Sequence, residues 1–154
     1  MIKLFAKAWE KNSKNLEKWF AENTQDKYSD YKVIWKAVLD IVVNPIMRRP
    51  FDTERITEVD DGEYQGTLLF ITPFDTYQPC HYEYVLTFVD YGSCSGCDTL
   101  LAINHFDDAD LPTELQVKEY MKLALDMLQA ARPIFDAKVD NLGSWEIEWW
   151  EKEK

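Results

Sequence analysis

Three cysteines and two histidines are the side chains of this chain with the widest range of possible chemistry. Cys94 and Cys97 form a CxxC motif, and Cys80, His81 and His105 are the other candidate metal ligands. A structural zinc ion takes about four Cys or His ligands, normally from two such pairs. The spacing of the other three residues follows no standard zinc pattern. We therefore expect no cofactor, and zinc bound by these five residues remains the alternative.

The CxxC motif is also the spacing of dithiol redox centres, in which a lowered thiol pKa produces the reactive thiolate. Asp90 and Asp98 flank the motif, and nearby carboxylates are expected to raise a thiol pKa. Small residues around the two cysteines permit a tight loop, in which buried cysteines would behave as small apolar side chains. The sequence favours this structural interpretation and leaves the zinc and thiol interpretations open.

Motifs for other kinds of catalysis are missing from the sequence. It contains no GxSxG, no phosphate-binding glycine loop and no HExxH, which are the patterns of common hydrolases, nucleotide-binding proteins and metalloproteases. The acidic run at 107–110 lacks the glycine and the distal glutamate of a calcium loop. We assign no catalytic residue, and the sequence does not favour an enzyme.

The formal net charge of −11 is distributed unevenly. Residues 56–117 contain 12 acidic residues and no Lys or Arg, whereas residues 1–55 contain 11 Lys and Arg against 8 acids. Such a segment repels phosphates, so direct binding to nucleic acid is not expected. A basic protein partner is expected instead, unless the acids serve only solubility. The candidate partner-binding residues, which turns and loops should expose, are Asp60, Asp61, Glu63, Asp75, Asp107, Asp108 and Asp110.

The first third of the chain has the apolar periodicity of helices. Residues 1–43 are expected to form one helix or two short ones, interrupted near Asn12-Ser13, and then a further helix. That further helix should begin with Ser29 as its N-cap and continue to Val43. The dipeptide Asn44-Pro45 should end it, because a residue before proline is disfavoured in helical conformation.

The middle of the chain changes to the composition of strands. Residues 56–59, 66–73 and 82–91 are rich in β-branched and aromatic side chains. The run at 82–91 is apolar on both faces, so we expect it to be central in the sheet. These strands predict an antiparallel sheet.

Two more helices and a last strand complete the prediction. Asp98 is placed to cap a short helix, and a longer helix should begin at Asp110 and end near Pro133. Trp and Ile alternate with Glu at 145–150, which predicts a final strand, although an exposed Trp surface for binding is the alternative. The predicted fold class is α+β, with N-terminal helices, an antiparallel β-sheet of about four strands, and a helix packed on one face.

A length of 154 residues fits one domain, residues 1–154, with a helical part at 1–43 and a core at 55–133. No apolar run reaches the length of a membrane span, and the first residues lack the features of a secretory signal. An odd number of cysteines does not fit a complete disulfide framework. We therefore expect a cytoplasmic location, and no binding to membranes.

Four sequence blocks resemble a family of small, uncharacterised bacteriophage and prophage proteins. They are DDGEYQGTLLFI (60–71), DTYQP (75–79), YGSCSGCDTL (91–100) and YMKLALDMLQ (120–129). Together they cover roughly half of the chain, from Arg55 to Pro133. The resemblance implies a phage origin and the cytoplasm of a host cell, but it brings no activity to carry over. Asp126 stands where the family pattern suggests a histidine, and Cys80 looks particular to this chain.

These observations lead to one main functional hypothesis and two alternatives. The main one is a phage-encoded acidic binding protein that acts on a host protein, for instance as a counter-defence inhibitor of the DNA-mimic or anti-CRISPR type. Its partner would be a host nucleic-acid-binding protein or nuclease; this comparison is an analogy. The alternatives are a small zinc- or thiol-dependent protein centred on Cys94 and Cys97, and an accessory domain without chemistry.

Overall fold

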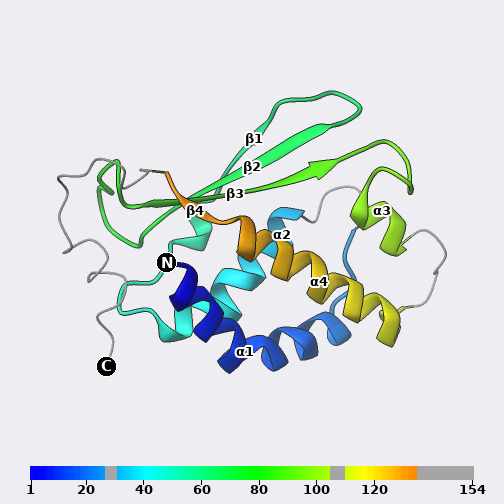
Figure 1. Cartoon of the computed structure of the whole chain (residues 1–154), viewed down its shortest axis with the longest axis horizontal. Helices are drawn as coiled ribbons and strands as arrows, with labels where there is room; N and C mark the ends of the chain where they lie inside the picture. The colour runs from blue at the N-terminus through cyan, green and yellow to red at the C-terminus, as the bar shows by residue number, and fades with distance from the viewer. Residues whose placement is uncertain (27–30, 105–109, 135–154) are drawn as a thin grey trace.

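The structure is a computed structural model that describes residues 1–26, 31–104 and 110–134 (Figure 1). The chain begins with α1 (Ile2–Glu22), one continuous helix, which decides between the two predicted arrangements of this segment. It continues with α2 (Tyr31–Ala37), which leads directly into the π-helical segment η1 (Val38–Val43). Ser29, the expected N-cap of the second helix, lies outside the described residues.

The second helix does not stop sharply at Asn44-Pro45. The N–H of Asn44 donates to the carbonyl of Leu39, five residues back, and a 3-10 turn, η2 (Asn44–Ile46), follows. At this irregular end, the Val42 carbonyl accepts a hydrogen bond of 2.9 Å from the buried side chain of Asn12 in α1. Asn12, which the sequence marked as a weak point of the first helix, is therefore a buried link between two helices.

Four antiparallel strands form one sheet, as the sequence predicted, and their order is β1-β2-β3-β4. They are β1 (Thr57–Asp60), β2 (Gly66–Pro73), β3 (Tyr84–Tyr91) and β4 (Arg132–Pro133). The β2–β3 pairing runs from Gly66 opposite Tyr91 to Pro73 opposite Tyr84. The fourth strand is the two-residue β4, and the strand predicted at 145–150 lies outside the described residues.

Helices cover one face of the sheet (Figure 1). On that face the Trp35 indole donates to the Thr72 hydroxyl of β2 at 3.1 Å, and the Thr87 hydroxyl of β3 donates to the Met127 carbonyl at 2.6 Å. Because side chains alternate along a strand, Leu86 and Phe88 of β3 point to the opposite face. Phe88 is 47% exposed there.

The prediction that β3 is central in the sheet is confirmed, because β3 lies between β2 and β4. β3 pairs with β2 along its whole length but with β4 at two positions, Val85 and Leu86. Among the described elements, the helices pack on one face and none lies over the other. The apolar side chains of the open face therefore do not pack against these helices.

The last two helices are close to the prediction, but the second of them begins later than expected. The short α3 (Thr99–Asn104) is followed by α4 (Glu114–Ala130), and the N-cap of α4 is Thr113 instead of Asp110. The Thr113 hydroxyl accepts from the Gln116 N–H at 3.3 Å, while the Gln116 side chain accepts from the Thr113 N–H at 2.9 Å. This reciprocal pair satisfies two free donors at the start of α4.

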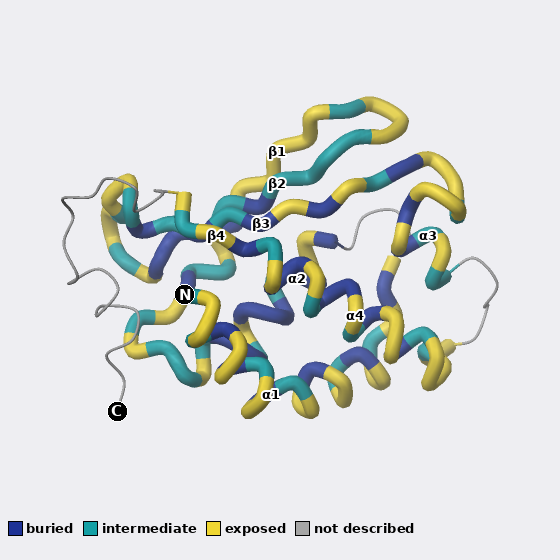
Figure 2. Tube along the Cα trace, in the orientation of Figure 1, coloured by how far each residue is buried: buried dark blue, intermediate teal, exposed yellow. Residues whose placement is uncertain are grey.

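The core lies between the helices and the covered face of the sheet (Figure 2). Its largest fully buried side chains include Trp35 from α2, Phe20 from α1, Tyr120 from α4 and Phe70 from β2. The rings of Phe20 and Tyr120 stack with their centroids 5.3 Å apart. Helices α1, α2 and α4 and strand β2 therefore each contribute a large side chain to the same core.

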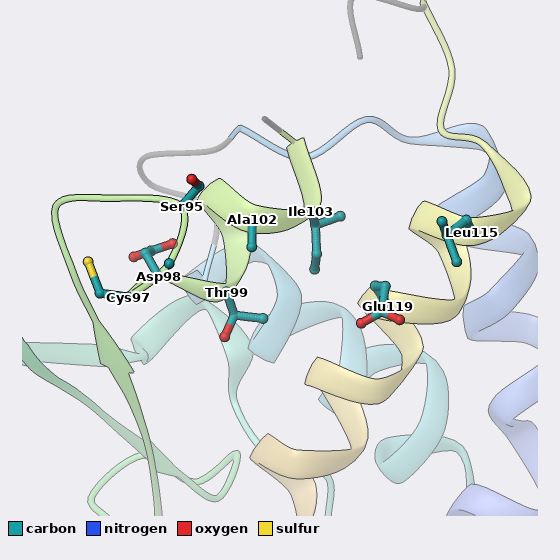
Figure 3. Close-up of a pocket in the computed structure, with 9 residues that line it drawn as sticks. Ser95, Cys97, Asp98, Thr99, Ala102, Ile103, Leu115 and Glu119 are labelled. Carbon is teal, nitrogen blue, oxygen red and sulfur yellow. The ribbon is translucent and has the colours of Figure 1, made fainter. Parts of the chain in front are cut away.

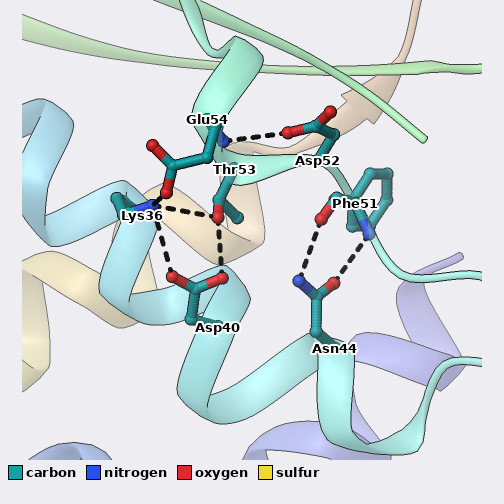
Figure 4. A network of polar contacts seen from close by, with 7 residues as sticks. All are labelled: Lys36, Asp40, Asn44, Phe51, Asp52, Thr53 and Glu54. Atoms are coloured by element: carbon teal, nitrogen blue, oxygen red, sulfur yellow. Dashed lines mark hydrogen bonds and ion pairs between the residues drawn. The ribbon is translucent and has the colours of Figure 1, made fainter. Parts of the chain in front are cut away.

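The connector that leads from the helices to the sheet is fixed by polar contacts (Figure 4). The Asn44 side chain accepts from the Phe51 N–H at 2.8 Å and donates to the Phe51 carbonyl at 3.1 Å. Lys36 donates to Glu54 and to the hydroxyl of Thr53, which begins the 3-10 turn η3 (Thr53–Arg55). In the parts of the chain that the structure describes, none of the helices has both the length and the apolar character needed to cross a membrane.

The link from Asn12 to Val42 can be tested by mutation. Replacing Asn12 with Ala leaves the Val42 carbonyl buried without this donor, so we expect the free energy of unfolding to fall by about 1–3 kcal/mol. The matched control is Asn15→Ala, on the exposed side of the same helix, where the change should stay within about 0.5 kcal/mol. Urea denaturation followed by tryptophan fluorescence measures both. Equal effects of the two substitutions would contradict the structural role of Asn12.

Candidate functional site

The loop after β3 is fixed by one buried carboxylate, that of Asp98. Its Oδ1 accepts from the Tyr31 hydroxyl at 3.0 Å and from the Leu101 N–H at 2.9 Å. Its Oδ2 accepts from the Gly92 N–H at 3.1 Å. The prediction that Asp98 caps the short helix α3 is confirmed by the bond from Leu101. The same carboxylate also joins the end of β3 to α2, which the sequence did not suggest.

Tyr31 completes this cluster from the side of α2. Its hydroxyl donates to Asp98 and accepts from the Leu100 N–H at 3.1 Å. Burial raises the pKa of Tyr31 well above its ordinary value, and the charge of Asp98 raises it further. The hydroxyl therefore stays protonated at neutral pH and keeps its bond to the carboxylate.

The two cysteines of the CxxC motif lie in one tight turn. The Cys94 N–H donates to the Cys97 Sγ at 3.0 Å, and the Cys97 N–H donates to the Cys94 carbonyl at 2.9 Å. The Cys97 Sγ also lies 3.2 Å from the Cys94 carbonyl oxygen. A Cβ at Gly92 would come within 2.5 Å of the Cys97 Sγ, so the turn can close against the strand end only where that residue is glycine.

The expectation that these cysteines are buried is wrong, because both are exposed and neither forms a disulfide. Asp98, at the end of the loop, is buried instead, and its hydrogen bonds to Gly92 and Leu101 hold the turn at the surface. Structural packing of small apolar thiols therefore does not explain Cys94 and Cys97. Their exposure makes both of them accessible to reagents.

The two thiols differ in acidity. The Cys97 thiol and then the Gly96 N–H lower the pKa of Cys94, because both hydrogen-bond to its sulfur and stabilise the thiolate. The hydrogen bond to Cys94 raises the pKa of Cys97. The charge of Asp98 does raise the pKa of Cys94, as expected from the sequence, but the hydrogen bonds outweigh it. The predicted net rise for Cys94 is therefore wrong.

The structure does not gather the predicted metal ligands. Cys80 precedes β3 and Cys94 follows it, and a strand of this length separates its ends by about 25 Å. His81 packs edge to face against the Tyr82 ring, and His105 lies outside the described residues. Within residues 1–26, 31–104 and 110–134, no group of three or more His, Cys, Asp or Glu side chains is placed to hold a metal ion.

A groove of about 520 Å³ runs between the CxxC loop and α4 (Figure 3). Ile103 and Leu115 form its apolar part, and Leu115 is 68% exposed. Figure 3 shows the Cys97 sulfur pointing away from Leu115 and Glu119, so the loop borders the groove with its backbone. The sequence did not indicate this groove, because its two walls are separate segments brought together by the α3–α4 packing.

Five of the seven acids predicted to bind a partner are described, and all five are exposed: Asp60, Asp61, Glu63, Asp75 and Asp110. Asp107 and Asp108 lie outside the described residues. Two of the five also have a structural role in the β1–β2 turn, since Asp60 accepts from the Gly62 N–H and the Tyr91 hydroxyl, and Asp61 accepts from the Thr67 N–H. The Gly62 N–H and then the Tyr91 hydroxyl lower the pKa of Asp60, and the bond to Asp60 raises the pKa of Tyr91 to about 12.

The cations of the first 55 residues do little to neutralise the acidic segment. Among ion pairs with both partners described, Arg49–Glu83 at 2.7 Å alone joins residues 1–55 to residues 56–117. Burial raises the pKa of Glu83, but the Cys80 N–H and Arg49 lower it more, so that the pKa is lowered overall. Glu83 and Asp98 are buried, and the exposed acids of the segment are Glu58, Asp60, Asp61, Glu63, Asp75, Asp90, Asp110 and Glu114.

Apolar side chains lie on the open face of the sheet, to which Asp90 also points because it lies two residues after Phe88 in β3. Glu58 and Asp60 flank Val59 in β1 and point to the other face of the same hairpin. Val59 pairs with Leu69, and Leu69 pairs with Phe88, which places the three side chains in one row across β1, β2 and β3. Val59 is 42% and Phe88 is 47% exposed. We call this set the open-face row. It went unnoticed in the sequence because its members become neighbours only through strand pairing.

The chain was compared with protein-family models, with curated proteins and with solved structures, and none of the three comparisons found a match. The class that the structure defines is an α+β protein with a four-stranded antiparallel sheet covered by helices on one face. The resemblance of the four blocks to phage and prophage proteins remains a prediction.

The buried Asp98 cluster predicts a selective effect on stability. In Asp98→Asn, an amide N–H would replace one of the two oxygens and leave a buried donor unpaired, so the free energy of unfolding should fall by about 1–3 kcal/mol. The control is Asp90→Asn, an exposed acid of the same strand and loop, with an expected change within about 0.5 kcal/mol. Urea denaturation measures both. A loss in Asp90→Asn as large as that in Asp98→Asn would refute the anchoring role.

The acidity difference predicts an order of alkylation. In a Cys80→Ser background, iodoacetamide at neutral pH should modify Cys94 before Cys97, because the thiolate is the reactive form. The rate at Cys94 should rise with pH and reach half of its maximum below the ordinary thiol value of 9.0, since the pKa is lowered. Peptide mapping by mass spectrometry gives the rate at each site. Preferential modification of Cys97 would show that Cys97, and not Cys94, has the lower thiol pKa.

Proposed function

We propose that this chain is an acidic binding protein that docks on a basic protein partner through the β1–β2 hairpin and the open face of its sheet. The observation that carries the proposal is the open-face row, Val59, Leu69 and Phe88, in the same strands that carry exposed carboxylates. Protein interfaces commonly combine an apolar centre containing aromatic residues with a polar rim. An acidic surface intended only for solubility has no need of such a row.

Charge decides which partner fits this surface. The hairpin offers Glu58, Asp60, Asp61 and Glu63 from β1 and the turn, all exposed. Mutual repulsion among such carboxylates costs stability, and a partner with Lys and Arg at its surface relieves it. The same field steers a basic partner toward the face and raises its association rate. Nucleic acid would meet repulsion here instead.

The partner class follows from two further arguments. A basic groove that binds nucleic acid recognises closely spaced negative charges, and carboxylates on a protruding hairpin supply such charges, as DNA-mimic inhibitors do by analogy. The four sequence blocks that resemble phage and prophage proteins favour a host protein as the target. We therefore propose a host nucleic-acid-binding protein or nuclease, with counter-defence inhibition as the biological role.

The test measures association rates after the partner has been isolated by affinity capture from host lysate. The rate constant should fall with rising NaCl concentration, and Glu58→Lys with Glu63→Lys should lower it by about tenfold at low salt. These two acids are chosen because, within the described residues, neither carboxylate has a hydrogen bond or ion pair. The matched control is Glu17→Lys with Glu22→Lys on α1, which changes the net charge equally on the helical side of the molecule.

The outcomes separate a specific surface from a general charge effect. An equal loss in the hairpin variant and in the α1 variant would contradict the proposal, as would a rate that is indifferent to salt. Phe88→Ala should speed dissociation, whereas Val33→Ala, at 42% exposure on α2, should not. If Phe88→Ala instead lowered the free energy of unfolding by more than about 1 kcal/mol, the row would be covered by part of this chain and unavailable to a partner.

A further inference from the structure

The acidic surface makes no use of the CxxC turn, which lies at the opposite end of β3 from Cys80. We propose that Cys94 and Cys97 form a dithiol that is oxidised reversibly to an intramolecular disulfide by exchange with a disulfide of another molecule. The proposal rests on the geometry of the turn, the exposure of both thiols and the anchoring of the turn at both of its ends.

The turn places the Cys97 sulfur against the backbone of Cys94. The Cys94 N–H points at the Cys97 Sγ from 3.0 Å, and that sulfur has the Cys94 carbonyl at 3.2 Å and the Cys94 sulfur as acceptors for its S–H. At Gly96 a Cβ would find the Cys94 Sγ at 4.0 Å as its nearest neighbour, so the turn has room around this sulfur. Two thiols held in one turn by these contacts need little movement to form a bond.

Each thiol has a distinct role in the exchange. Cys94 is the attacking group, because hydrogen bonds from the Cys97 thiol and the Gly96 N–H stabilise its thiolate. Cys97 has a raised pKa and stays protonated, which suits a resolving thiol that reacts second. Both residues are exposed, so an external disulfide can reach their sulfur atoms.

The step conserves atoms and electrons. The Cys94 thiolate attacks one sulfur of the external disulfide, forms a mixed disulfide with it and releases the other half as a thiolate, which takes a proton from water. Cys97 then loses its proton to water and attacks the Cys94 sulfur, which breaks the mixed disulfide and releases the second half. Two electrons pass from the protein to the external disulfide, which becomes two thiols. The reverse sequence regenerates the dithiol.

The surrounding contacts suit a turn that must survive a change of bonding. Asp98 accepts from the N–H groups of Gly92 and Leu101, one on each side of the turn. These bonds involve neither sulfur, so oxidation leaves them in place. The cluster also ties the turn to Tyr31 of α2, which prevents the loop from moving away from the core.

Zinc is the competing occupant of two adjacent thiols. Zinc sites in proteins use about four ligands, and within the described residues no group of three or more Cys, His, Asp or Glu side chains is placed to hold a metal ion here. The two interpretations make opposite predictions for the purified chain, because bound zinc would protect both thiols from oxidation and from alkylation.

The experiment equilibrates the full chain with glutathione buffers of increasing disulfide content, using glutathione disulfide as the probe. In Cys80→Ser, mass spectrometry should show the loss of two hydrogens and a Cys94–Cys97 cross-link, with one reversible midpoint. Cys97→Ser should trap a glutathione adduct on Cys94, and Cys94→Ser should form an adduct on Cys97 more slowly, on the order of tenfold. Urea denaturation of all variants verifies that each is folded.

Three results would overturn the proposal. The first is a Cys80→Ser chain that accumulates glutathione adducts but no internal cross-link. The second is about one equivalent of bound zinc per chain, or half of that in a dimer, with both thiols protected. The third is equal adduct rates on Cys94 and Cys97 in the two single variants, which would remove the distinct roles. Because the acidic-surface variants leave the turn intact, failure of the binding proposal would not change any of these outcomes.

Discussion

A buried carboxylate must be surrounded by hydrogen-bond donors, and in this protein that constraint brings distant segments together at Asp98. Taking a carboxylate out of water costs several kcal/mol unless donors replace the lost hydration. Here the donors are the Tyr31 hydroxyl and the N–H groups of Gly92 and Leu101. One requirement therefore fixes the position of α2 against the end of β3 and the start of α3, and with them the shape of the CxxC turn.

The other end of β3 is held in a related way. Glu83 is buried just before the strand and accepts from Arg49 and from the Cys80 N–H, at 2.7 and 2.8 Å. The two acids of the segment that lacks Lys and Arg that are buried among its described residues thus flank one strand, and both are hydrogen-bonded. The remaining described acids of this segment are exposed, so most of its negative charge lies at the surface and not in the core.

The one-sided packing of the sheet explains how a structural role and the proposed binding role can coexist. The covered face carries the core, including Phe70, Thr72 and Thr87, and its hydrogen bonds to Trp35 and Met127 set the distance between the layers. The open face bears the row of Val59, Leu69 and Phe88, whose exposure costs free energy in an isolated chain. Apolar exposure in strands that also carry unneutralised carboxylates is the combination that a basic partner is proposed to relieve.

Local patterns in the sequence determined the α+β class, the position of β2, the helical character of much of the chain before residue 44 and the cap formed by Asp98, because each depends on residues within a few positions of one another. Even the difference between Thr113 and Asp110 as the start of α4 is a local error, since both residue types cap helices. Other features depend on partners far apart in the chain. Asn12 reaches Val42 across 30 residues, Arg49 reaches Glu83 across 34, and Tyr31 reaches Asp98 across 67.

These long-range partners are the reason that the sequence alone misjudged the candidate site. Composition placed acids beside the cysteines and predicted a raised pKa, but the folded loop directs the Asp98 carboxylate toward three donors and directs N–H and S–H groups toward the Cys94 sulfur. The same folding buries Glu83 and Asp98 while it exposes Cys94 and Cys97. Residue types and spacing determined which chemistry is available to this protein, and the tertiary structure decided which groups are exposed, because burial and hydrogen bonding are settled by contacts between distant segments.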